Sequence, residues 1–160
     1  LSFFICSILL FLVFIYLKID YKDFYLQYID FPSSIGSSNF PTANISSIDI
    51  GLSDDEIFVT FSNYGVSSIW MSLDAGSTWL EKESNLPDMP VRWGVLHPDN
   101  SNFALLATEI GVWSTSNLLS DTPAWAPASN GLANVRVDML SMRESDNMVL
   151  AASVSQSCSR

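Results

Sequence analysis

An internal repeat constrains the fold of this chain more than any other feature of its sequence. Short apolar stretches separated by turns recur in the same order, and several alternate apolar and polar residues as half-buried β-strands do. In the first copy they cover residues 45–50, 56–61, 69–72 and 78–80, and in the second 91–96, 103–108, 111–114 and 124–126. A third copy begins with residues 135–140 and 148–152.

The spacing of equivalent residues defines the period of this repeat. Trp70 and Trp113 are 43 residues apart, and Trp79 and Trp125 are 46 residues apart. Four short strands in about 40 to 50 residues is the period of a β-propeller blade. Residues 40–152 are therefore predicted to be all-β, with blades of four antiparallel strands, about two of them complete and part of a third.

A compact polar turn is predicted between the third and fourth strands of the first copy. Gly76 can adopt a positive φ at no steric cost, and the Asp74 carboxylate can accept hydrogen bonds from backbone N–H groups of the turn. Ser72 and Thr78 add hydroxyl groups on either side, and Trp79 offers a large apolar surface to the following strand. These five residues are therefore predicted to be structural.

The pattern S-x-D-x-G-x-T-W resembles the Asp box, or bacterial neuraminidase repeat, of sialidases, sortilin-type receptors, xyloglucan-degrading hydrolases and secreted bacterial surface proteins. The resemblance covers residues 40–152 and implies a secreted or cell-surface protein whose box lies on the propeller rim, away from the ligand-binding centre. No catalytic residue, metal or cofactor is assigned to the box. The second copy departs from the pattern through an expanded turn at residues 118–123, where Asp121 is an open candidate for the role of Asp74.

The two ends of the chain differ from this repeat. Residues 1–22 form an apolar segment that resembles a membrane or signal segment, and residues 1–17 are near the lower length limit of a membrane-spanning helix. Residues 23–39 read as a linker, and residues 153–160 as an irregular tail. Membrane association through residues 1–17 is one expectation. A second is that both ends are truncated or frame-shifted relative to a longer gene, because the chain starts abruptly with apolar residues and stops resembling the repeat after residue 152. Two blades and part of a third also do not close a ring.

Charge and residue usage exclude several classes of function. The net charge of −10 and the scattered cations Lys82, Arg92, Arg136 and Arg143 argue against nucleic-acid binding. Neither cysteine belongs to a zinc or disulfide pattern. His97, the only histidine, precedes Pro98 and is predicted to be a surface turn residue. Residues 54–56 are predicted to form a solvated turn rather than a calcium site.

Three functional hypotheses follow from these observations, one of which is a sortilin-type peptide-binding receptor. The first is a non-catalytic fragment of a secreted or cell-surface propeller that serves as a scaffold or binds a carbohydrate or protein ligand. The alternative is part of a sialidase or xyloglucanase whose active site lies largely outside this chain. Glycoside hydrolysis needs two facing carboxylates, and Asp49, Asp138 and Glu109 are candidates only because they lie in or beside strands. Four tryptophans are expected mainly to pack between strands rather than to stack on sugars: Trp70, Trp93, Trp113 and Trp125.

Overall fold

A computed structural model describes residues 40–128, 135–143 and 145–153 of the chain, and these residues form ten β-strands and no helix. The prediction of an all-β chain is confirmed for this part, which contains no helix that could span a membrane. The predicted apolar segment at residues 1–22 and the linker at 23–39 lie outside the described residues. The predicted tail begins one residue too early, because Ser153 pairs with Val137 and ends the last strand.

The strands form three antiparallel sheets, each connected in simple up-and-down order. Sheet A contains β1 (Ile45–Ile50), β2 (Ile57–Phe61), β3 (Ile69–Ser72) and β4 (Leu80–Glu81). Sheet B contains β5 (Val91–His97), β6 (Asn100–Thr108), β7 (Gly111–Thr115) and β8 (Ala126–Pro127). Sheet C is the hairpin of β9 (Val137–Arg143) and β10 (Met148–Ser153). The first strands of the three sheets begin 46 residues apart, at residues 45, 91 and 137.

Both fourth strands begin later than the sequence predicts. The backbone N–H of Thr78 donates to the Asp74 carboxylate, and the N–H of Ala124 donates to the side-chain oxygen of Asn117. These two residues therefore still belong to turns, and strand pairing starts only at Leu80 and Ala126.

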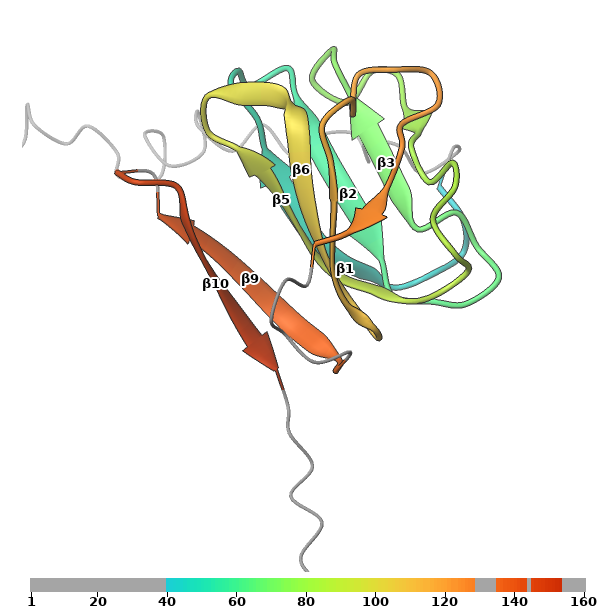
Figure 1. The fold of residues 1–160 in the computed structure, drawn as a ribbon. Helices are drawn as coiled ribbons and strands as arrows, with labels where there is room; N and C mark the ends of the chain where they lie inside the picture. The colour runs from blue at the N-terminus through green and yellow to red at the C-terminus, as the bar shows by residue number, and fades with distance from the viewer. Residues whose placement is uncertain (1–39, 129–134, 144, 154–160) are drawn as a thin grey trace, which may run out of the picture. The chain divides into compact units, whose positions relative to one another are not determined.

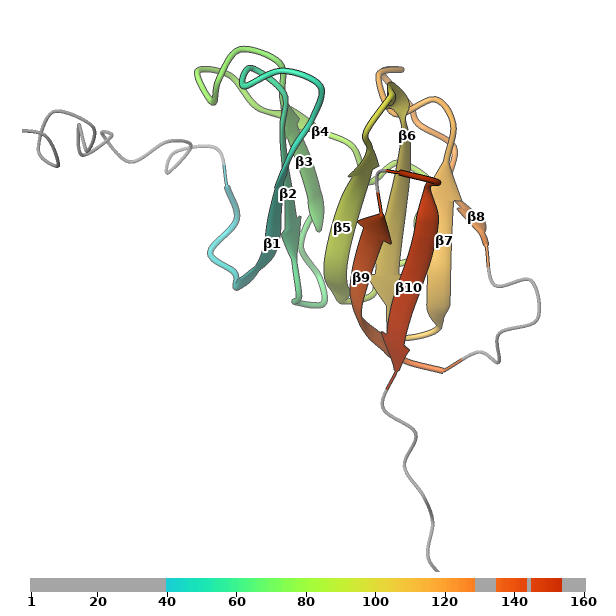
Figure 2. The same ribbon diagram turned by 90° about the vertical axis from the view of Figure 1, so that its left-hand side faces the viewer.

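Successive sheets pack against each other in chain order, as Figure 2 shows for β1 to β3, β5 to β7 and β9 with β10. One hydrophobic cluster joins sheets A and B and includes Phe58 and Met71 of sheet A with Leu106 and Trp113 of sheet B. A second cluster joins sheets B and C around Leu140. Burial of these apolar side chains is the main stabilising contribution to such packing.

The strands of sheet A lie beside those of sheet B (Figure 1), and polar side chains of β1 hydrogen-bond to the backbone of β5. Ser46 Oγ donates to the carbonyl of Val91 at 2.6 Å, and Ser47 Oγ accepts from the N–H of Gly94 at 2.9 Å. Backbone groups at the edge of β5 are thus satisfied by side chains rather than by another strand. The isoleucines of β1 point to the opposite face, where Ile48 is 61% and Ile50 is 51% exposed.

Candidate functional site

The turn between β3 and β4 is closed by hydrogen bonds among the side chains of Ser72, Asp74 and Thr78. Asp74 Oδ1 accepts from the N–H of Thr78 at 2.7 Å, and Asp74 Oδ2 accepts from Thr78 Oγ1 at 2.6 Å. Ser72 Oγ donates to Asp74 Oδ1 at 2.8 Å and accepts from the N–H of Gly76 at 2.8 Å. Gly76 has a φ of +85°, and Ala75 before it also has a positive φ, of +54°. Within this turn every contact of the Asp74 carboxylate is local.

The hydrogen bonds from the side chain and backbone of Thr78, followed by that from Ser72, lower the pKa of Asp74 below its ordinary value. Beside the turn, the Trp79 ring packs edge-on against Phe40, with ring centroids 4.6 Å apart. The geometry assigns these residues to the stability of the turn and of the adjacent sheet face.

Asp74→Ala should lower the thermal midpoint at neutral pH, because the N–H and hydroxyl of Thr78 lose their acceptors. The folded-state pKa is lowered, so the carboxylate stabilises the fold above the ordinary aspartate value, about pH 4, and this contribution disappears as the pH falls through the lowered pKa. The difference in midpoint between wild type and variant should therefore shrink in acid. Asp54→Ala, in an exposed turn, is the control; a pH-independent difference for Asp74→Ala would contradict the assignment.

Asn117 occupies the corresponding position in the second sheet, 43 residues after Asp74. Thr115 Oγ1 donates to Asn117 Oδ1 at 2.9 Å, and the N–H of Ala124 donates to the same oxygen at 2.8 Å. These bonds reproduce those that Ser72, Asp74 and Thr78 make in the first turn. The sequence left Asp121 open as the counterpart of Asp74, but the structure gives that role to an amide in place of a carboxylate.

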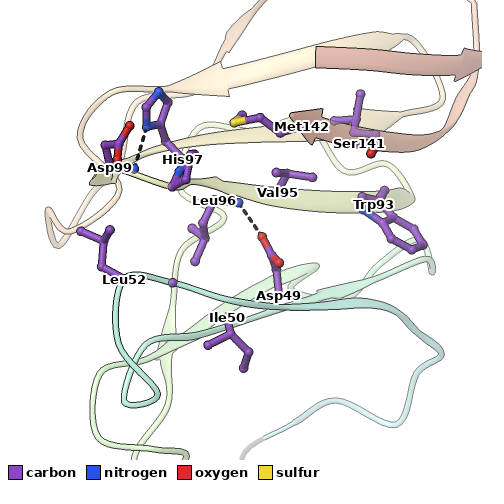
Figure 3. Close-up of a pocket in the computed structure, with 13 residues that line it drawn as sticks. Asp49, Ile50, Leu52, Trp93, Val95, Leu96, His97, Asp99, Ser141 and Met142 are labelled. Atoms are coloured by element: carbon purple, nitrogen blue, oxygen red, sulfur yellow. Dashed lines mark hydrogen bonds between the residues drawn. The ribbon is translucent and has the colours of Figure 1, made fainter. Parts of the chain in front are cut away.

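An open pocket of about 660 Å³ lies at the carboxyl-terminal ends of β1 and β5 and beside β9 (Figure 3). It therefore draws on the first strand of all three sheets. In Figure 3, Trp93 lies at one end, His97 and Asp99 lie at the other, and Asp49 projects between β1 and β5. The remaining lining residues are mostly aliphatic: Ile50, Gly51, Leu52, Val95, Leu96, Pro98, Leu140, Ser141 and Met142.

The three carboxylates that the sequence offered as candidates bind different partners. Asp49 Oδ2 accepts the N–H of Leu96 at 2.8 Å. Glu109 forms an ion pair with Arg92, and Asp138 forms one with Arg136. Only Asp49 lines the pocket, so the described structure brings no two of these three carboxylates together there.

The four tryptophans singled out from the sequence divide into packing residues and one pocket residue. Trp113 and Trp125 are 9% and 2% exposed and belong to the cluster between sheets A and B. Trp70 packs edge-on against Phe40 at 5.9 Å. Trp93 is half-buried, packs beside the second cluster and lines the pocket.

His97 is not the surface turn residue that the sequence predicted. It pairs with Asn100 as the last residue of β5, so the turn is confined to Pro98 and Asp99. Its ring packs edge-on against Phe103 at 5.7 Å, and Nδ1 accepts the N–H of Asp99 at 3.1 Å. The 46-residue repeat does not indicate this, because the residue equivalent to His97 is Gly51, which lies just after β1.

The turn at residues 54–56, predicted to be solvated, is exposed at its first two residues but hydrogen-bonded to other parts of the protein at its third. Asp54 and Asp55 are exposed, but the Glu56 carboxylate accepts hydrogen bonds from the N–H of Leu52 at 3.3 Å and from Ser101 Oγ at 3.0 Å. Glu56 therefore links sheet A to the β6 strand of sheet B. Across the described residues no group of three or more His, Cys, Asp or Glu side chains is arranged to hold a metal ion.

No family model matches the chain, and no curated protein matches it either. The repeat, the two equivalent turns and the pocket are therefore the features of the chain that bear on its function.

Proposed function

We propose that residues 40–153 are successive blades of an Asp-box β-propeller that has a non-catalytic, ligand-binding role in a secreted or cell-surface protein. The observation that carries the proposal is the regular succession of sheets. Two four-stranded antiparallel meanders follow each other, and a hairpin begins a third sheet at the same 46-residue interval. Sheets repeated at this period and packed in chain order are the building units of a propeller.

The two turns support the Asp-box part of the proposal. Ser72 with Asp74 and Thr115 with Asn117 form equivalent hydrogen bonds at equivalent positions in sheets A and B. The turn of the second sheet keeps this bonding despite its expanded length. The pocket supports a binding role, since it is formed by the first strands of successive sheets rather than by these turns.

The charged side chains favour binding over glycoside hydrolysis. A sialidase holds the substrate carboxylate with arginines, but each arginine among the described residues forms an ion pair with an acid: Arg92 with Glu109, Arg136 with Asp138 and Arg143 with Asp146. Of the three carboxylates that the sequence offered as candidates for hydrolysis, only Asp49 lines the pocket, and the other acidic residue there, the exposed Asp99, lies in the turn after β5. The proposed alternative of a hydrolase fragment has no comparable observation in its favour.

The full chain should release no sugar from a fluorogenic sialoside or from xyloglucan. Fluorescence and reducing-sugar assays should give the same rates for wild type and for the Asp49→Ala, Glu109→Ala and Asp138→Ala variants. Turnover that one of these substitutions abolishes would contradict the non-catalytic role and favour the hydrolase.

A further inference from the structure

The charge of the pocket lining is one-sided. Asp49 and Asp99 are the acidic side chains, while no lysine or arginine is among the lining residues. The chain as a whole carries a net charge of −10. A hollow lined by one sign of charge attracts ligands of the opposite sign and disfavours those of the same sign. Carboxylate and phosphate ligands are therefore disfavoured in this pocket.

The Asp49 carboxylate is held in place before any ligand arrives. Its Oδ2 accepts the N–H of Leu96 across the contact between sheets A and B, and no hydrogen bond to Oδ1 occurs within the described part of the chain. Asp49 is half-buried, so an ion pair to it is less screened by solvent than one at an exposed surface. Oδ1 is thus left as a hydrogen-bond acceptor on a side chain that lines the pocket (Figure 3).

The rest of the lining fits an aliphatic chain and a cation. Val95, Leu96 and Met142 provide apolar surface along the pocket, and the Trp93 indole provides an aromatic ring at one end. Aromatic rings attract ammonium groups through their quadrupole. Methylene groups gain free energy when they leave water for aliphatic side chains.

We propose that this pocket binds an aliphatic ammonium group, with the cation at the Asp49 carboxylate and the methylene chain against Val95, Leu96 and Met142. This inference rests on the binding role proposed above and names its ligand class. A free polyamine and a lysine side chain of a partner protein share this chemistry.

The test compares three small molecules of similar length and different charge. Cadaverine, 1,5-pentanediol and glutarate are each titrated into the isotope-labelled full chain, and backbone amide shifts are followed by NMR. Cadaverine is expected to move the Leu96 amide resonance and to bind at least about tenfold more tightly than the diol, because a charged hydrogen bond is worth more than a neutral one. Glutarate is expected not to bind. Raising the salt from about 0.05 to about 0.5 M should weaken cadaverine binding severalfold.

Two variants locate the binding to the pocket. Asp49→Asn keeps an oxygen for the Leu96 N–H but removes the charge, and it should weaken cadaverine binding about tenfold. Asp54→Asn makes the same change in net charge at an exposed turn outside the pocket and should leave the affinity unchanged. If Asp49→Asn does not fold, Asp99→Asn provides the second test. The Asp99 side chain forms no hydrogen bond within the described structure, so the substitution should not impair folding. It should weaken binding severalfold.

Several outcomes would overturn the inference. They are equal affinity for cadaverine and pentanediol, preferential binding of glutarate, binding of a xyloglucan oligosaccharide without cadaverine, and equal effects of Asp49→Asn and Asp54→Asn. None of these outcomes involves sugar release. They would therefore contradict the ammonium proposal without contradicting the proposed non-catalytic role, which sugar release tests. A lysine-containing tripeptide and its norleucine counterpart then distinguish the sources: tighter binding of the lysine peptide than of cadaverine indicates a protein partner.

Discussion

Trp125→Ala is expected to lower the free energy of unfolding of the full chain by about 3–5 kcal/mol, the usual range for truncating a buried tryptophan. Trp125 is 2% exposed and lies in the cluster between sheets A and B. Its indole Nε1 donates to the carbonyl of Lys82 at 2.8 Å. The substitution therefore leaves both a cavity and a buried carbonyl without its partner.

The backbone of Trp125 adds to this connection between the sheets. Its N–H donates to Asn85 Oδ1 at 2.7 Å, and Asn85 Nδ2 donates to its carbonyl at 3.0 Å. Urea denaturation monitored by circular dichroism measures the loss in the free energy of unfolding. Trp93→Ala is the matched control. Because Trp93 is half-buried at the pocket, this substitution should lower the free energy of unfolding by clearly less than Trp125→Ala does. Equal losses for the two variants would show that Trp125 does not hold the sheets together.

Gly94→Ala is expected to destabilise the chain by about 1–3 kcal/mol, because it crowds a closely packed contact. A Cβ atom at Gly94 would lie 2.6 Å from Cε1 of Phe58 and 2.8 Å from Cγ2 of Thr60. Both neighbours are 0% exposed, so neither can move into solvent. The added methyl group must push sheet B away from sheet A, at the residue whose N–H donates to Ser47.

A second substitution separates crowding from other effects of losing a glycine. Phe58→Leu makes space beside residue 94, so the Gly94→Ala and Phe58→Leu double variant should lose less stability than the two single variants together. Gly65→Ala is a useful contrast, because its Cβ would meet no atom within 4 Å and its cost would come only from a φ of +69°. Strict additivity of the double variant would mean that the Phe58 contact does not limit residue 94.

Gly94→Ala bears on the pocket as well as on stability. Asp49 reaches Leu96 across the same contact between β1 and β5 that Gly94 keeps close. A shift of sheet B would therefore displace the carboxylate that the ammonium proposal requires. Gly94→Ala should consequently weaken cadaverine binding even under conditions in which the variant remains folded.

The sequence by itself determined the all-β class, the order of the strands and most of their bounds within two residues. It also indicated the turn residues Ser72, Asp74 and Gly76. These features depend on interactions between residues close in the chain, such as alternation of side chains along a strand and the reach of a carboxylate over four residues. The hydrogen bonds of Asp74 could be predicted for this reason, because all of its partners lie between residues 72 and 78.

Only the tertiary structure decided which side chains meet in the pocket and along the contacts between sheets. Asp49 and Leu96 are 47 residues apart, and their hydrogen bond depends on how sheet A packs on sheet B. Alternation indicates that β1 has two faces, but it does not indicate that the serines and Asp49 face sheet B while Ile48 and Ile50 face away. His97 was misplaced for a different, local reason: it pairs with Asn100 three residues further on, so the turn preference of its neighbours applies only to Pro98 and Asp99. Local preferences thus specified the units of this protein, and long-range packing specified the site that they form.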